Sequence, residues 1–259
     1  MGLENTNKLK ILLSTWPTNT VATSNWLSSQ GISSQLAKKY VSSGWMVAVG
    51  QAAFKKLNET ISWQGGVYAL QEHLGLPVHV GGLTALSYHG VSHYLRLGKE
   101  TIFLFTKPMV NLPKWFEGYA WDKSIVLLRT GFLNEQTGIN VYLDHGIEIK
   151  FSTVERAILE TLYLVPKHLD IIECYQIIEG LHNLRPALQQ QLLEECNSIK
   201  VKRLFLFMAE KANLPVIKHL DLQKIYLGKG DRSIVKNGSY DRKYGLILPE
   251  ELIKRERSI

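Results

Sequence analysis

Hydrophobic and polar positions alternate with a helical period over residues 34–43. The apolar side chains fall on one stripe of this helix: Leu36, Ala37, Tyr40 and Val41. The opposite face is polar and carries no acidic residue: Ser34, Gln35, Lys38, Lys39 and Ser42. Ser33 is placed to cap the helix and Gly44 to end it. A face of hydroxyl, amide and ammonium groups suits a phosphate-lined groove, because it donates to phosphates and reaches base edges.

A shorter helix precedes this one and a strand pair follows it. The short helix is expected to start after Thr23 or Ser24 and to stop at Gly31. Residues 45–49 alternate like a strand, and residues 52–54 return beside it. This order predicts a winged helix-turn-helix. Two basic side chains lie where the wing would touch a DNA backbone: Lys55 and Lys56.

We therefore predict a DNA-binding surface made of the cap, the polar helix face and the wing: Ser33, Ser34, Gln35, Lys38, Lys39, Ser42, Lys55 and Lys56. A capped amphipathic helix with two lysines is also common on solvated surfaces that bind nothing. The pattern alone leaves that structural interpretation open.

The rest of the chain predicts an α+β protein with two domains. An opening helix over residues 3–14 completes an N-terminal winged helix-turn-helix domain at 1–60, and a larger mixed α/β C-terminal domain follows at 61–259. The larger domain is divided into a mixed α/β part, a mainly helical part and terminal strands: 75–151, 152–213 and 220–250.

Individual elements of the C-terminal domain follow from their own patterns. Helices are expected over 62–74, 83–89, 171–181, 186–196 and 199–212, and strands over 77–80, 101–106, 125–129, 139–144, 147–151 and 244–248. His145-Gly146 marks a hairpin turn, which favours an antiparallel sheet. Leu112–Trp115 resembles an exposed turn, and Ser152 with Glu155 matches a capping box.

Composition and charge narrow the class of protein. The chain has 259 residues, of which 45% are hydrophobic and 20% charged, as in ordinary globular proteins. Its net charge is +7, with an excess of basic residues at 1–70 and 199–259 and an acidic middle. Two basic ends suit one nucleic-acid-facing end and a separate charged surface. The two cysteines lie in helical patterns and no apolar run is long enough for a membrane span, so we expect a cytoplasmic protein without membrane contact.

Motifs for catalysis and metal binding are weak. His79, His89 and His93 invite a metal interpretation, but HExxH is absent and Gly90 interrupts the i, i+4 pair. The sequence also lacks GxGxxG, GxxxxGK[ST] and GxSxG. We expect no metal, no cofactor and no catalytic residue.

Two basic groups in the C-terminal domain are candidates for a second surface: Lys200, Lys202 and Arg203, and the loop residues Lys229 and Arg232. The first group opens a helix whose dipole disfavours cations there. It is either held by acidic partners in the core or placed to contact another molecule. The two glycines of the loop 228–232 are suited to expose N–H groups to an anion, although a solvent-exposed β-turn is the favoured explanation of the loop on its own.

Many short stretches together resemble the AbiEi antitoxins of type IV toxin–antitoxin systems. In the first half these are Gly31–Ser33, Tyr40–Trp45, Ser62–Gly65, His79–Gly82, Thr84–Leu86, Gly90, His93–Leu95 and Leu112-Pro113-x-Trp115. In the second half they are Glu155–Ala157 with Leu159-Glu160, Gly180-Leu181 with Leu184–Pro186, Lys200–Leu206 and Leu227-Gly228-x-Gly230-x-Arg232. Their order and span make the combination specific.

The resemblance implies an N-terminal winged helix that represses its own operon by binding inverted repeats in double-stranded promoter DNA. It also implies a C-terminal antitoxin domain that neutralises a nucleotidyltransferase toxin without a stable complex, and no enzymatic activity. The wing over 47–52 lacks Lys and Arg, so DNA affinity is expected to depend on lysines 38, 39, 55 and 56. Two alternatives stay open: an RNA-repair enzyme that acts on the toxin's product through loop 228–232, and an RNA-binding module that contacts tRNA.

Overall fold

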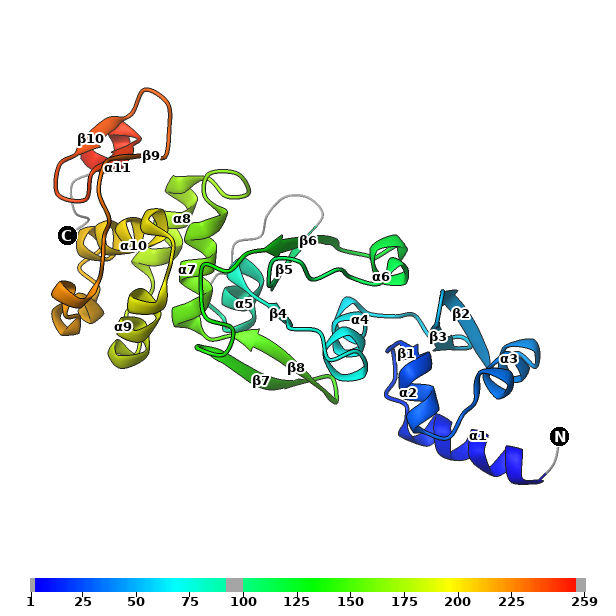
Figure 1. Ribbon diagram of the computed structural model, residues 1–259. Helices are drawn as coiled ribbons and strands as arrows, with labels where there is room; N and C mark the ends of the chain where they lie inside the picture. The colour runs from blue at the N-terminus through cyan, green and yellow to red at the C-terminus, as the bar shows by residue number, and fades with distance from the viewer. Residues whose placement is uncertain (1–2, 92–99, 255–259) are drawn as a thin grey trace.

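A small N-terminal domain is followed by a larger C-terminal domain in the computed structural model, which describes residues 3–91 and 100–254. The molecule is elongated, with the N-terminal helices at one end and the last strands at the other (Figure 1). The described chain contains both helices and strands, with sheets that include antiparallel pairs, in agreement with the predicted α+β class. None of the described helices combines the length and the apolar composition that crossing a bilayer requires.

The N-terminal domain contains three helices and a three-stranded sheet. The helices are α1 (Leu3–Thr15), α2 (Ser24–Ser29) and α3 (Ser34–Ser42), and the strands are β1 (Ala22–Thr23), β2 (Met46–Gly50) and β3 (Ala53–Lys56). The sheet order is β1-β3-β2, with antiparallel pairing throughout. Thr23 and Ser33 cap α2 and α3 as predicted, and Gly31 and Gly44 have the positive φ that ends them. The two-residue β1 is too short to give a pattern and was not predicted.

A five-stranded sheet forms the centre of the C-terminal domain. Its strands are β4 (Val78–Val80), β5 (Thr101–Thr106), β6 (Ser124–Arg129), β7 (Ile139–Asp144) and β8 (Ile147–Ser152), in the order β6-β5-β4-β8-β7. The predicted hairpin is confirmed, with positive φ at His145 and Gly146. The expectation of an antiparallel sheet is wrong, because β5 pairs with β6, and β4 with β8, in parallel. Parallel neighbours need a crossover, and the chain between β5 and β6 supplies one through α6 (Lys114–Gly118).

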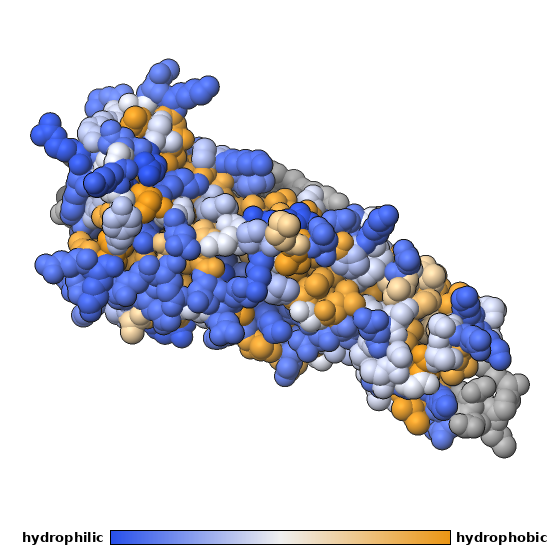
Figure 2. Space-filling view, viewed as in Figure 1, coloured by the Kyte–Doolittle hydropathy of each residue, from blue (hydrophilic) through white to orange (hydrophobic). Residues whose placement is uncertain are grey.

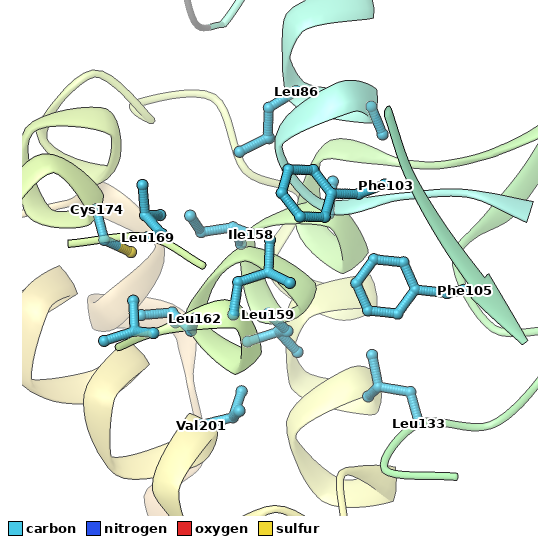
Figure 3. Close-up of a cluster of buried hydrophobic side chains, with 14 of the residues drawn as sticks. Leu86, Phe103, Phe105, Leu133, Ile158, Leu159, Leu162, Leu169, Cys174 and Val201 are labelled. Carbon is cyan, nitrogen blue, oxygen red and sulfur yellow. The ribbon is translucent and has the colours of Figure 1, made fainter. Parts of the chain in front are cut away.

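Helices cover this sheet and extend the domain. Besides α6, the helices up to residue 211 are α4 (Trp63–Tyr68) with a π-helical turn (Ala69–His73), α5 (Gly82–Tyr88), α7 (Val154–Leu164), α8 (Ile171–Glu179), α9 (Pro186–Glu195) and α10 (Ile199–Lys211). Figure 3 shows Phe103 and Phe105 of β5 beside Ile158, Leu159 and Leu162 of α7. The core therefore lies between the sheet and α7. The other helices of the predicted helical part, α8, α9 and α10, pack against α7.

The chain ends in a second small sheet. Two 3-10 turns (Pro215–His219 and Leu222–Lys224) lead to β9 (Arg232–Ser233), β10 (Ser239–Asp241) and β11 (Leu246–Leu248), followed by α11 (Glu250–Lys254). The strand order is β10-β11-β9. On the face shown in Figure 2, hydrophilic side chains cover much of this end, and apolar patches appear along the middle of the molecule.

Two local predictions were wrong for a shared reason, which is that distant contacts replace local ones. Thr153, and not Ser152, is the N-cap of α7, and its side chain makes no cap bond. Ser152 belongs to β8, and Glu155 binds Arg185 instead of reaching back. The expected exposed turn at Leu112–Trp115 leads into α6, where Trp115 is buried.

The two domains are in close contact. Trp26 of α2 stacks on His73, with ring centroids 4.9 Å apart and an interplanar angle of 15°. Burial lowers the pKa of His73 to about 4, so its ring is neutral at ordinary pH and suits this apolar junction. At the end of β2, the backbone of Gly50 lies against Trp115 of α6; a Cβ there would be 2.6 Å from that of Trp115. The tip of the β2–β3 hairpin is thus packed on the C-terminal domain.

Gly65→Ala is expected to lower the free energy of unfolding by about 2 kcal/mol or more, because overpacking exceeds the helix-propensity gain. A Cβ at Gly65 would lie 2.1 Å from the carbonyl oxygen of Asn19, where two backbones meet between the domains. Urea unfolding measures the loss. Gly118→Ala is the matched control, because its Cβ meets nothing within 4 Å. Equal stability of both variants would show that the close packing of Gly65 against Asn19 does not exclude a larger side chain.

Candidate nucleic-acid interface and the buried carboxylate of Glu160

Helix α3 presents a polar face that its own core side chains fix. The Ser33 hydroxyl accepts a hydrogen bond from the backbone N–H of Leu36 at 3.2 Å, which holds the first turn. Ala37 and Tyr40 are buried against the domain core. Because these two side chains point inward, the residues between them point to solvent.

All six predicted DNA-binding residues of the α3 region are exposed: Ser33, Ser34, Gln35, Lys38, Lys39 and Ser42. The Ser42 hydroxyl donates to the carbonyl of Lys39 at 3.0 Å. Within the described part of the chain, neither Lys38 nor Lys39 has an ion-pair partner. The helix therefore offers two ammonium groups and several donors on one accessible surface.

Lys55 and Lys56 are held differently from the lysines of α3. The ammonium group of Lys55 donates to the carbonyl of Glu59 at 2.8 Å. That of Lys56 donates to the carbonyl of Trp16 at 2.7 Å, lies 3.5 Å from the Glu59 carboxylate and sits 5.9 Å from the centre of the Trp16 ring. Both ammonium groups thus bind within the N-terminal domain, and this argues against a main role in binding phosphate.

The structure corrects the expectation that Lys202 and Arg203 form a surface, because both side chains are buried. The Lys202 ammonium group donates to the carbonyl of Tyr226 at 3.2 Å. Lys200 is half-buried and donates to the carbonyls of Tyr163 and Val165. Burial lowers the pKa of Lys200 and of Lys202. These cations are held by backbone carbonyls, and not by the acidic partners that were considered.

Arg203 binds the glycine loop from inside. Its guanidinium donates to four backbone carbonyls: those of Leu227 (2.8 Å), Gly228 (3.2 Å), Gly230 (2.6 Å) and Gly245 (3.3 Å). Arg232 also donates to carbonyls of the loop, including that of Asp231 at 2.9 Å, while Lys229 is exposed. The loop turns carbonyls toward cations, which is the opposite of an anion-binding turn. Of the five candidates, only Lys229 is fully on the surface.

A buried polar cluster around Glu160 was not predicted. The Glu160 carboxylate is fully buried and receives four donors: His79 Nε2 (2.8 Å), Arg156 Nε (2.7 Å), the Ser152 hydroxyl (2.7 Å) and the Gly82 N–H (2.9 Å). Burial alone would raise the pKa of Glu160, but the charges of His79 and Arg156 and the hydrogen bonds from His79 and Ser152 lower it to about 2. The carboxylate is therefore ionised at all ordinary pH values.

Two histidines from the metal hypothesis have other partners. His79 binds Glu160, and His89 Nε2 lies 2.8 Å from the carbonyl of Ser152. His93 lies outside the described residues. Across residues 3–91 and 100–254, no three His, Cys, Asp or Glu side chains are grouped as metal ligands. The spacing of Arg156 and Glu160 signals only an i, i+4 pair, and no sequence pattern connects either of them to His79.

Comparisons with known proteins point to one family. The family model described as "Transcriptional regulator, AbiEi antitoxin, Type IV TA system" matches residues 99–249. The model described as "Transcriptional regulator, AbiEi antitoxin N-terminal domain" matches residues 5–97. Among solved structures, the RV2827C protein from Mycobacterium tuberculosis is similar, with a TM-score of 0.58 and 11% identity over 95% of this chain and 91% of that chain. At this identity the likeness concerns the fold. A comparison with curated proteins found no match.

Glu160→Gln is expected to lower the free energy of unfolding by about 3–5 kcal/mol near neutral pH, because it leaves Arg156 buried without its anion. The pKa of Glu160 is about 2 in the folded protein, below the value of about 4.3 in an unfolded chain. The stabilisation is thus complete above that unfolded value and is lost as the pH falls toward 2.

Urea unfolding at neutral and acidic pH tests both statements. The difference in the free energy of unfolding between wild type and Glu160→Gln should become smaller in acid. Glu148→Gln removes an exposed carboxylate and should change the free energy of unfolding little at either pH. A difference that stays constant with pH would contradict the ionised state of Glu160.

Proposed function

Because the chain belongs to the AbiEi family of antitoxins and transcriptional regulators of type IV toxin–antitoxin systems, we propose that it represses its own operon and neutralises the toxin encoded with it. DNA binding is assigned to the N-terminal domain acting as a winged helix-turn-helix. Toxin neutralisation is assigned to the C-terminal domain. We propose no catalytic activity for either.

The exposed face of α3 is the observation that supports DNA binding. Its lysines and hydroxyl and amide groups are accessible together, while the apolar face is fixed in the core. Ser33, Ser34 and Gln35 at the start of α3 are suited to base edges and phosphate, and Lys38 and Lys39 to phosphate. Each chain presents few cations to the DNA phosphates, so two chains on an inverted repeat would bind more tightly than one.

The proposed partner of the C-terminal domain is a nucleotidyltransferase toxin, and we propose that neutralisation needs no stable complex. Lys229 and Arg232 remain candidates for this work, with Lys229 the more accessible. An RNA-repair activity of the loop 228–232 has less support, since the loop carbonyls face Arg203 and leave no cradle of N–H groups there. A direct contact with tRNA remains an alternative to action on the toxin.

Lys38→Glu with Lys39→Glu is expected to weaken promoter binding by about tenfold or more and to reduce the salt dependence. Each lost phosphate contact lowers the slope of log K against log salt by about 0.9, so the slope should fall by about 2 per bound chain. Fluorescence anisotropy with a promoter fragment carrying the inverted repeats measures both the affinity and its salt dependence. Growth rescue in cells that express the toxin should be unchanged.

Lys218→Glu with Lys236→Glu is the charge-matched control, since both lysines are exposed in the C-terminal domain. It should leave promoter binding and its salt slope close to those of wild type. If the α3 variant folds and loses both DNA binding and neutralisation, the assignment of the two activities to separate domains is wrong.

Lys56→Met is expected to affect stability more than DNA binding. It removes a charged hydrogen bond to the Trp16 carbonyl and the ion pair with Glu59, which together contribute about 1–2 kcal/mol in a partly exposed position. Thermal unfolding should show a lower midpoint while the salt slope of promoter binding stays near that of wild type. A lower slope with unchanged stability would instead place Lys56 on the DNA.

A further inference from the structure

A cavity of about 840 Å³ opens at one edge of the central sheet, and its lining includes no residue of the α3 face or of the loop 228–232. It lies where the parallel strands β5 and β6 end, between the segments 106–108 and 130–136, with the start of β4 on its other side. Open α/β sheets commonly bind ligands at the carboxyl ends of their strands. A volume of this size is in the range of small-molecule sites.

His79 joins the cavity to the buried cluster. The residue is 8% exposed and is one of those that line the cavity. Nε2 is held by Glu160 at 2.8 Å. Nδ1 has no hydrogen-bond partner within the described residues and is not among the enclosed, unpaired atoms, and the ring to which it belongs lines the cavity. A nearly buried ring with one nitrogen fixed and the other open is arranged to hydrogen-bond a ligand.

The wall of the cavity is held in place by Arg156. Its Nη1 donates to the carbonyls of Asn134 and Thr137, and its Nε binds Glu160. The segment after β6 is therefore tied to the same carboxylate that holds His79. This arrangement fixes the shape of the cavity before any ligand enters, which lowers the entropy lost on binding.

Among the residues that line the cavity, cations outnumber anions. Lys107, Lys150 and Arg156 line it together with one carboxylate, Glu135, which pairs with Lys107. Lys150 lies 3.6 Å from Glu72, outside the lining, and its side chain is 43% exposed. With Arg156 engaged by Glu160, Lys150 and Lys107 are the cations best placed to meet an anion.

The remaining lining is apolar and partly aromatic. Phe105 stacks on His79 with ring centroids 5.8 Å apart, and Phe132 and Ile139 contribute further apolar surface. A ligand that fits must therefore combine a negative group with a flat apolar part. Nucleotides have both, since a phosphate suits the lysines and a base suits the aromatic wall.

We propose that this cavity binds a nucleotide, with its phosphate at Lys107 and Lys150 and its base near His79 and Phe105. The nucleotide is either free or the terminal residue of an RNA strand, because both present the same chemistry. The site lies in the C-terminal domain and includes no residue of α3, so a test of nucleotide binding is independent of the proposal on DNA binding.

Isothermal titration calorimetry on the full chain tests the proposal with ATP, GTP, CTP and UTP separately, with a short single-stranded RNA, and with inorganic phosphate. At least one nucleotide or the RNA should bind with a dissociation constant below about 1 mM. Tighter binding of the RNA identifies a strand end as the ligand, and tighter binding of a nucleoside triphosphate identifies a free nucleotide. Phosphate alone should bind more weakly than either.

Lys107→Met with Lys150→Met is expected to weaken this binding about tenfold or more, and His79→Asn should weaken it as well. Both lysines are exposed enough that the double variant should fold, so it remains informative if His79→Asn does not. Lys218→Met with Lys236→Met is the control and should bind as wild type does. Absence of binding by all probes, or binding unchanged in the double lysine variant, would overturn the proposal.

Discussion

The carboxylate of Glu160 joins four elements from two distant parts of the chain, residues 79–82 and 152–160. It accepts hydrogen bonds from His79 of β4, Ser152 of β8, the N–H of Gly82 in α5 and Arg156 of its own helix. A buried carboxylate is tolerated only when donors satisfy it, so these elements must meet at one point for the domain to fold. The parallel pairing of β4 with β8 and the position of α7 on the sheet both depend on that meeting.

Lysines have different roles in this protein because the surroundings of their side chains differ. Lys38 and Lys39 sit on the outer face of α3, opposite two buried side chains, and their charges reach water. Lys56 and Lys202 lie along apolar surface and end on backbone carbonyls. A long stem lets a cation cover hydrophobic surface while its head finds an oxygen. The basic composition of a segment is therefore a poor measure of the charge it presents to a partner.

Local structure was largely predictable from the sequence, whereas long-range partners were not. Caps such as Ser33 and the hairpin at His145-Gly146 depend on neighbours a few residues away, so their patterns are visible in the chain. The parallel pairing of β5 with β6 depends on how the crossover packs, and the Glu160 cluster joins residues about 80 positions apart. Of the candidate surfaces, the α3 face follows from helical periodicity, but the burial of Arg203 requires a loop that folds over it from later in the chain.

The packing of Gly50 against Trp115 restricts the motion of the β2–β3 hairpin relative to the C-terminal domain. Any force that displaces the hairpin is transmitted to α6, and α6 forms the crossover between two strands of the central sheet. By linkage, a ligand that shifts α6 and a partner that shifts the hairpin must alter each other's affinity by the same factor. Together with the stacking of Trp26 on His73 and the close approach of Gly65 to Asn19, the contact of the Gly50 backbone with the Cα and Cβ of Trp115 couples the two domains energetically.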